Sequence, residues 1–301
     1  MDVRESVSEL KKLLSRVNPP ELPKLLHWIQ HSGELDELLL DNRKVMLQSI
    51  ADDLRALLPL DAMLPGEAAA HHKMQRRPRP TVHVDAFLYD DDQVDALCEG
   101  GAMSRNYCLH CGSQRTAPLD FVSHSFSVSE LHFLFQNVLP DLSGRTLVDV
   151  GSRLGAVLYG GYVYSSASLL LGVELSEEFV RLQNNMVEKY RLNDRVQVVQ
   201  ADICTQVTLL QNADVLIMNN VFEYFMEPKE QVKAWRFIIQ NFIKPSSLLV
   251  TVPSLQETLR DLQQEALPPG WVEELPVDYG VYVGGDTDPD ALRQIHLYKV
   301  M

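Results

Sequence analysis

The segment Leu147-Val-Asp-Val-Gly-Ser-Arg-Leu-Gly155 decides how the rest of the chain is interpreted. An aliphatic run that ends at Val150 leads directly into a glycine-containing turn, and apolar residues then resume from Ala156. Glycine lets a backbone turn tightly and approach a ligand closely, and N–H groups at the start of a helix can point toward a bound group. The segment therefore predicts a strand, a ligand-facing turn and a helix.

The same alternation of strand-like and helix-like runs continues to the C-terminus. We expect strands over 146–150, 169–174, 196–201, 215–219 and 247–253, with a closing strand over 295–300. Helical spacing lies between them, over 156–165, 177–190 and 230–242. This alternation predicts an α/β fold with a mostly parallel sheet and helices on both faces.

The chain before residue 146 divides by composition. Residues 1–64 show helical spacing, as in Val7, Leu10, Leu13 and Leu14, and predict an N-terminal helical module. We expect a linker over 65–80, an irregular connecting region over 81–120 and the main domain over 121–301. Within that domain, Ser127-Val-Ser-Glu130 has the form of a capping box and predicts a helix over 128–139.

Composition and charge restrict the function classes. The chain has 301 residues and a net charge of −14, and it contains no long apolar run and no N-terminal signal pattern. We therefore expect a soluble, intracellular protein, cytoplasmic or nuclear, with no membrane partner. The charge disfavours binding to a nucleic-acid backbone. The basic stretch 71–80 is the only local exception, and we interpret it as a solvated linker.

Polar residues follow three further strands of the expected sheet. Glu174 ends the second strand, Asp202 with Ile203 follows the third, and Asn219-Asn220 ends the fourth. In such a sheet, ligands bind outside the carboxyl ends of the strands. A carboxylate at Glu174 can accept hydrogen bonds from ribose hydroxyls, and Asp202 can accept one from an adenine amino group while Ile203 packs on the ring.

Together these features resemble the class I S-adenosylmethionine-dependent methyltransferases, over roughly residues 121–301. The resemblance implies a doubly wound, mostly parallel, seven-stranded Rossmann-like sheet with an antiparallel ending, and S-adenosyl-L-methionine as cofactor. A dehydrogenase would share the glycine turn and the acid after the second strand, but not the Asp202 signature or that ending. The implied cofactor-binding residues are Asp149, Gly151, Ser152, Gly155, Glu174, Leu175, Asp202, Ile203 and Asn219.

One position departs from the family pattern. Arg153 stands where the family usually has glycine. If the backbone there is left-handed, arginine costs roughly 1 kcal/mol or more. Its side chain would either crowd the carboxylate of the cofactor or form an ion pair with it. A catalytically silent scaffold with this fold is the alternative to an active enzyme.

The candidate catalytic residues follow the fourth strand: Asn219, Asn220, Glu223 and Tyr224. This segment resembles that of the non-SET histone-lysine methyltransferases and also that of many small-molecule methyltransferases. In the latter a histidine stands at the position of Tyr224. The acidic composition gives a slight preference for a protein acceptor, with a small molecule close behind. The acceptor and the oligomeric state are not predicted.

Cysteines provide one candidate metal site. Cys108 and Cys111 have the two-residue spacing of zinc ligands, and Cys98 is a candidate third ligand, with His83, His110 or His124 as the fourth. A second pair with this spacing is missing. We therefore favour reduced cysteines over zinc.

Overall fold

A computed structural model describes residues 3–31, 33–74, 80–110, 114–222, 225–262, 270–282 and 289–301. The chain divides into two compact units, Met1–Met46 and Leu47–Met301. Helices α1 (Val3–Leu14) and α2 (Leu22–His31) belong to the first unit, and α3 (Gly33–Leu57) crosses the boundary. This division differs from the expected module boundary at residue 64, because Leu47, Ile50 and Leu54 of α3 are fully buried in the second unit.

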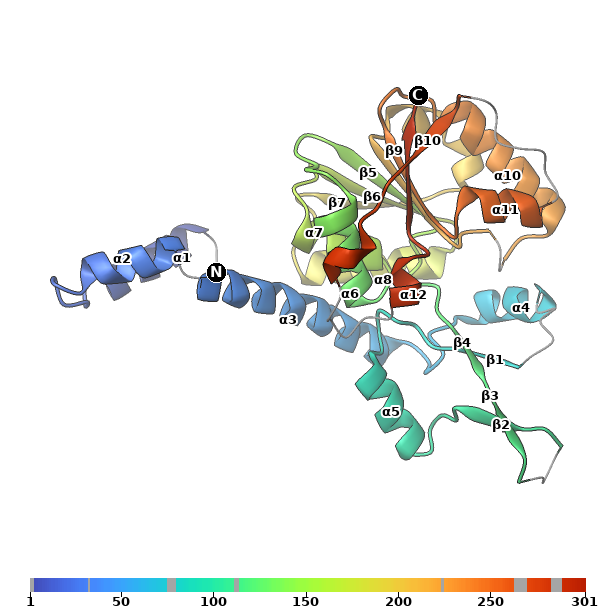
Figure 1. Cartoon of the computed structure of the whole chain (residues 1–301), viewed down its shortest axis with the longest axis horizontal. Coiled ribbons are helices and arrows are strands. Elements are labelled where there is room, and N and C mark those ends of the chain that lie inside the picture. Colours follow the sequence, from blue (N-terminus) through green and yellow to red (C-terminus); the bar gives the residue numbers. More distant parts are fainter. Residues whose placement is uncertain are drawn as a thin grey trace. The chain divides into compact units, whose positions relative to one another are not determined.

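The second unit is built on a mixed seven-stranded sheet (Figure 1). Its strand order is β10 (Val272–Leu275), β11 (His296–Val300), β9 (Leu248–Val252), β8 (Val215–Asn219), β5 (Thr146–Val150), β6 (Leu169–Glu174) and β7 (Val196–Gln200). Strands β9, β8, β5, β6 and β7 run parallel, whereas β11 is antiparallel to both β9 and β10. The expected mostly parallel α/β sheet is confirmed, together with its antiparallel ending.

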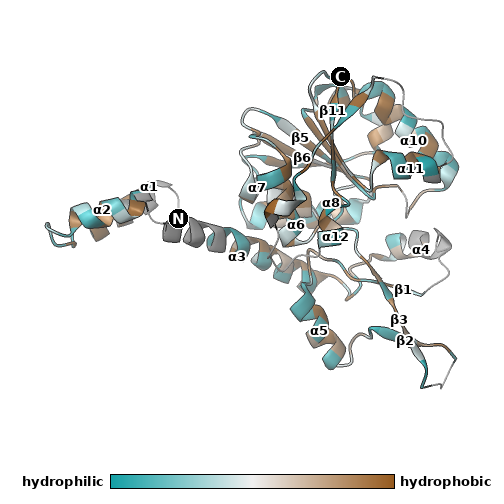
Figure 2. Ribbon diagram, in the orientation of Figure 1, coloured by the Kyte–Doolittle hydropathy of each residue, from teal (hydrophilic) through white to brown (hydrophobic). Residues whose placement is uncertain are grey.

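The central strands are buried on both faces. Successive side chains of a strand point to opposite faces, yet neighbouring residues such as Leu147 and Val148 are both fully buried. In Figure 2, β5 and β6 are coloured mainly brown, the colour of hydrophobic residues. Continuous aliphatic runs of this kind are typical of parallel strands covered by helices.

Helices cover both faces of the sheet. Helix α7 (Ala156–Tyr164) contacts β6, and α8 (Glu177–Lys189) contacts β6 and β7. The core of the other face includes residues of α9 (Val207–Asn212), α10 (Pro228–Asn241) and α11 (Leu255–Asp261). A short helix, α12 (Pro289–Leu292), precedes β11. Within the ranges given above, no helix is long and apolar enough to cross a membrane.

Helix α6 (Val128–Phe133) begins at the expected capping box. The Ser127 side chain accepts the N–H of Glu130, and the Glu130 carboxylate accepts the N–H of Ser127. Beyond Phe133 the coil widens into a π-helical turn, Leu134–Val138. The expected helix over 128–139 is therefore confirmed, but its second half is π-helical and not α-helical.

Residues 58–127, between α3 and α6, form a connecting region wider than the expected one and hold short elements: α4 (Pro65–Met74), β1 (Thr81–His83), α5 (Asp91–Glu99), β2 (Asn106–Cys108), β3 (Thr116–Pro118) and β4 (Asp120–Val122). Strands β1 and β4 pair in parallel, and β2 pairs with β3 antiparallel. Helix α4 lies within the expected linker over 65–80, of which residues 75–79 are outside the described residues. The run Glu67-Ala-Ala-Ala70 has high helix propensity, and Glu67 forms a buried ion pair.

Candidate functional site

A cavity opens at the carboxyl ends of the strands, where the strand order reverses between β5 and β8. Its volume is about 410 Å³, and its walls include Gly151 after β5, Glu174 at the end of β6, Asp202 after β7 and Asn219 at the end of β8. Open α/β sheets bind ligands at such a reversal. The residues selected from the sequence at four strand ends therefore meet in one place.

The turn after β5 uses three left-handed residues. Gly151 has φ +68°, Arg153 has φ +45° and Gly155, which precedes α7, has φ +86°. The N–H of Gly151 donates to the carbonyl of Val173 at 2.8 Å, which ties the turn to β6. A Cβ on Gly172 would lie 2.7 Å from Ser152 Oγ, so a glycine in β6 is needed for the turn to pack this closely.

Glu174, the last residue of β6, accepts a hydrogen bond from the turn that follows β5. One carboxylate oxygen accepts the backbone N–H of Arg153 at 2.9 Å, and the other accepts that of Ser176 at 2.8 Å. The residue is buried and lines the cavity. Since a carboxylate has about four acceptor positions, two of them stay available for a ligand.

Asp202 and Ile203 form the wall beyond β7. Asp202 is exposed, and its carboxylate accepts the N–H of Cys204 at 2.8 Å, which fixes the short turn Ile203–Thr205. Ile203 is buried and lines the cavity beside it. A polar acceptor thus lies next to an apolar surface, as recognition of a flat, amino-bearing ring requires.

Three of the expected cofactor residues are absent from the cavity wall. Asp149 in β5 and Ser152 and Gly155 in the turn do not line the cavity, whereas Gly151, Glu174, Leu175, Asp202, Ile203 and Asn219 do. Burial raises the pKa of Asp149 well above its ordinary value, and the charge of Glu174 adds to this shift. Asp149 is thus a buried carboxyl group of β5 outside the cavity lining.

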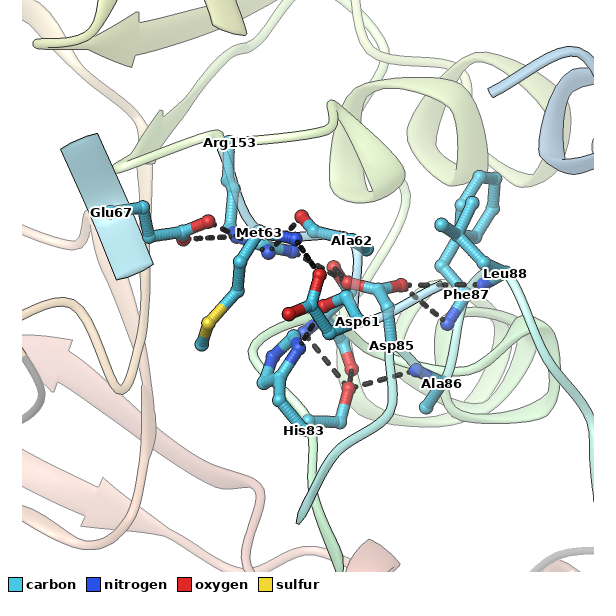
Figure 3. Close-up of polar contacts among 12 residues, drawn as sticks. Asp61, Ala62, Met63, Glu67, His83, Asp85, Ala86, Phe87, Leu88 and Arg153 are labelled. Atoms are coloured by element: carbon cyan, nitrogen blue, oxygen red, sulfur yellow. Dashed lines mark hydrogen bonds and ion pairs between the residues drawn. The ribbon is translucent and has the colours of Figure 1, made fainter. Parts of the chain in front are cut away.

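The Arg153 side chain forms buried ion pairs with Glu67 and Asp85. Figure 3 shows its guanidinium among residues of the connecting region: Nε lies 2.5 Å from Glu67 Oε1, and Nη1 lies 2.6 Å from Asp85 Oδ2. Nη2 donates to Glu67 Oε2 at 3.0 Å and to the Ala62 carbonyl at 2.7 Å. The Phe179 ring lies 5.3 Å from the guanidinium carbon. Arg153 thus joins the turn to the segment from Ala62 to Asp85.

Asp85 is the fully buried centre of this contact. Its Oδ1 accepts the N–H groups of Phe87 at 3.0 Å and Leu88 at 3.3 Å, while Oδ2 accepts the Ser125 hydroxyl at 2.7 Å besides Arg153. These bonds turn the backbone after Val84. Strand β1 accordingly stops at His83.

The candidate catalytic residues are only partly described. Asn219 and Asn220 both line the cavity. Asn220 has φ +48°, and its side-chain amide donates to Asn219 Oδ1 at 3.0 Å. Glu223 and Tyr224 lie outside the described residues.

A histidine that the sequence analysis did not associate with the cavity lines its wall. His124 is buried, with its ring centroid 4.4 Å from that of His83 and 5.2 Å from that of Phe225. His83 Nδ1 in turn lies 2.5 Å from the Asp61 carbonyl oxygen. The parallel pairing of β1 with β4 brings the two histidines together, and no local sequence pattern predicts that pairing.

The cysteine site stays a prediction. Cys98 is partly buried, Cys108 is exposed, and Cys111 lies outside the described residues. Among the side chains that the structure describes, no three His, Cys, Asp or Glu residues are grouped as metal ligands.

The topology decides the fold family. If β5 to β11 are numbered 1 to 7 in chain order, their order across the sheet is 6-7-5-4-1-2-3, and strand 7 runs antiparallel to its neighbours. The glycine turn, Glu174, Asp202 and Asn219 stand at the carboxyl ends of strands 1 to 4 in that order. The second unit has the class I methyltransferase fold. The alternative, a dehydrogenase sheet, lacks the antiparallel ending.

Comparison with known proteins gives distant structural matches. No protein-family model and no curated protein matches the sequence. An O-methyltransferase from Bacillus cereus, solved with SAH, is 15% identical, with 60% of this chain and 84% of that chain covered and a TM-score of 0.40. An RNA methyltransferase from Salinibacter ruber, solved with S-adenosyl-L-homocysteine, is 15% identical. The match covers 57% of this chain and 88% of that chain, with a TM-score of 0.36.

A third match is a protein from Methanococcus maripaludis provisionally assigned as an S-adenosyl-L-methionine-dependent methyltransferase. It is 19% identical, with 45% of this chain covered and a TM-score of 0.35, and the match spans 59% of its own length.

Proposed function

We propose that this chain binds S-adenosylmethionine and transfers its methyl group to an acceptor. The observation that carries this proposal is the convergence of Gly151, Glu174, Asp202 and Asn219, from four strand ends, on one cavity. A volume of about 410 Å³ falls in the range of small-molecule sites.

The residues present fit the three parts of that cofactor. The left-handed turn at Gly151 exposes backbone for the methionine part, and the free acceptor positions of Glu174 suit two ribose hydroxyls. Asp202 suits the adenine amino group, with Ile203 against the ring. When bound, the cofactor supplies a methyl group on a positively charged sulfur.

The protein contributes to the transfer mainly by positioning the acceptor next to the methyl group. A nucleophilic atom of the acceptor forms a bond to the methyl carbon while the carbon–sulfur bond breaks and its electron pair stays on sulfur. The acceptor must also lose a proton if it is an amine or a hydroxyl. His124 is the imidazole in the cavity wall and is our candidate to receive that proton. Asn219 and Asn220 are candidates to orient the acceptor.

The charge of the protein and of its cavity also favours one class of methyl acceptor. A protein or a small molecule suits the net charge of −14 better than nucleic acid does. The cavity itself is also acidic, since Glu67, Glu174 and Asp202 line it and Arg153 is the basic residue beside them in the described lining. We therefore propose an acceptor that is neutral or basic.

A labelling experiment tests transfer. Wild type and Glu174→Ala are incubated with S-adenosylmethionine labelled in its methyl group and with cell extract separated into protein, nucleic-acid and small-molecule fractions. We expect wild type to label one fraction, preferably protein or small molecules, and the variant to label none. If wild type binds S-adenosylhomocysteine but labels no fraction, the chain is a binding scaffold and the enzyme proposal is wrong.

A further inference from the structure

Glu67 is a buried carboxylate in the cavity wall. It lies in the first turn of α4, its side chain is 7% exposed, and it lines the cavity beside Gly66 and Arg153. Among the described residues, both hydrogen bonds to its carboxylate come from the Arg153 guanidinium. About two of its four acceptor positions are therefore available to a ligand.

The charges around Glu67 do not balance. Arg153 brings one positive charge to two buried carboxylates, Glu67 and Asp85. Asp85 has its two oxygens fully occupied by Arg153, Ser125 and two backbone N–H groups. Glu174 lies close enough to repel Glu67 as well. Because a buried charge without full compensation is costly, the cluster favours a cationic ligand at its open member, Glu67.

Titration of Glu67 agrees with this imbalance. Burial raises the pKa of the Glu67 carboxyl, and the charges of Glu174 and Asp85 add to the increase. Arg153 opposes the shift but does not cancel it. A cation placed at the free side of the carboxylate would favour the ionised form.

The position of Arg153 identifies which part of the cofactor lies there. Arg153 belongs to the turn to which we assign the methionine part, and its backbone N–H is bonded to Glu174 at 2.9 Å. The aminoacyl end of S-adenosylmethionine carries an ammonium group with three N–H donors. We propose that the Glu67 carboxylate binds this α-ammonium group, an assignment that rests on the proposed function.

Calorimetry with two ligands tests the assignment. S-Adenosylhomocysteine carries the aminoacyl group, whereas 5′-methylthioadenosine has the same adenosine and lacks it. We expect Glu67→Gln to weaken binding of S-adenosylhomocysteine by roughly 10- to 100-fold, the loss of one hydrogen bond between charged groups, and to change binding of methylthioadenosine by less than about threefold. Glu177→Gln, at an exposed carboxylate that is not part of the cavity lining, is the matched control and should change neither.

The other outcomes overturn the assignment in distinct ways. Equal weakening of both ligands would place Glu67 at the ribose, and unchanged affinity for both would remove it from binding. Tighter binding of S-adenosylhomocysteine by Glu67→Gln would mean that Glu67 competes with the cofactor carboxylate for Arg153. If wild type binds neither ligand, the proposed function itself fails.

A ligand-side measurement needs no variant, which matters if Glu67→Gln does not fold. The des-amino analogue of S-adenosylhomocysteine keeps the carboxylate and lacks only the ammonium group. We expect wild type to bind this analogue at least tenfold more weakly than S-adenosylhomocysteine. Equal affinities would contradict a carboxylate partner for the ammonium group.

Discussion

The Glu67 carboxylate and the Arg153 guanidinium, 86 residues apart in sequence, meet through contacts of 2.5 Å and 3.0 Å at the edge of the cavity. This pair joins helix α4 to the glycine turn (Figure 3). An arginine at a position where a glycine is expected is thereby explained, because its side chain fastens the connecting region to the turn that the cofactor is proposed to occupy.

Replacing Arg153 with glycine should destabilise the protein. Glycine relieves the left-handed backbone, φ +45°, by about 1 kcal/mol, but it leaves Glu67 and Asp85 buried without their cation, which costs roughly 3–5 kcal/mol. The net expectation is a loss of about 2–4 kcal/mol in the free energy of unfolding, measured by urea denaturation.

Arg191→Gly is the matched control for this prediction. Arg191 also has a left-handed backbone, φ +56°, but its side chain is exposed. The same substitution there should leave stability unchanged or raise it by about 1 kcal/mol. A wild-type-like Arg153→Gly variant would show that the buried ion pairs contribute little.

Gly172→Ala should weaken the packing of the turn on β6. The new methyl group would lie 2.7 Å from Ser152 Oγ and 2.8 Å from Leu158 Cδ1, closer than carbon and its neighbours normally approach. We expect thermal unfolding to report a loss of about 1–3 kcal/mol. In Gly66→Ala the methyl group meets no atom within 4 Å, so that variant should be as stable as wild type or more so. Equal effects of the two substitutions would contradict close packing at Gly172.

Asp149 should make stability fall as the pH rises. Its folded-state pKa is raised well above the ordinary value of 3.8, so the folded protein keeps a proton that the unfolded chain releases above that value. Stability therefore decreases from about pH 4 upward, until the folded-state pKa is passed. Asp149→Asn has no titrating carboxyl group at this position and removes this contribution to the pH dependence of stability.

Urea denaturation of wild type and Asp149→Asn at pH 5 and pH 8 checks the sign. The variant should lose less stability between the two pH values than wild type does. Glu67, whose pKa is also raised, contributes a slope of the same sign in both proteins. Parallel pH dependence of the two proteins would show that Asp149 titrates normally.

His124→Asn should separate transfer from cofactor binding. If His124 receives the proton of the acceptor, the variant should label the acceptor fraction at least tenfold more slowly while its affinity for S-adenosylhomocysteine stays within about threefold of wild type. Labelling at neutral pH with the isolated acceptor fraction and calorimetry provide the two readouts. Unchanged labelling would remove His124 from the reaction.

The sequence predicts those parts of the fold that local patterns determine. Strands β5, β6 and β8 have the expected bounds, because uninterrupted aliphatic runs are flanked by turn residues. The residues at strand ends were also found, since strand direction alone brings them to one edge of the sheet.

Contacts between distant segments could not be predicted in this way. Glu67 lies in a segment whose prolines and basic residues indicated a linker, and its role depends on Arg153. His124 reaches the cavity because β4 pairs with β1. Both depend on tertiary pairing between segments whose local sequence carries no signal of it.

Calorimetric titration of the wild-type chain with S-adenosylhomocysteine tests the central claim most directly, with Glu174→Ala as the site variant and Glu177→Ala as its exposed control. We expect saturable binding to one site by wild type and by the control, and at least a tenfold weaker affinity for Glu174→Ala. No binding by the folded wild-type protein would contradict the claim that this cavity holds the methyl donor, and equal binding by Glu174→Ala would contradict the ribose assignment.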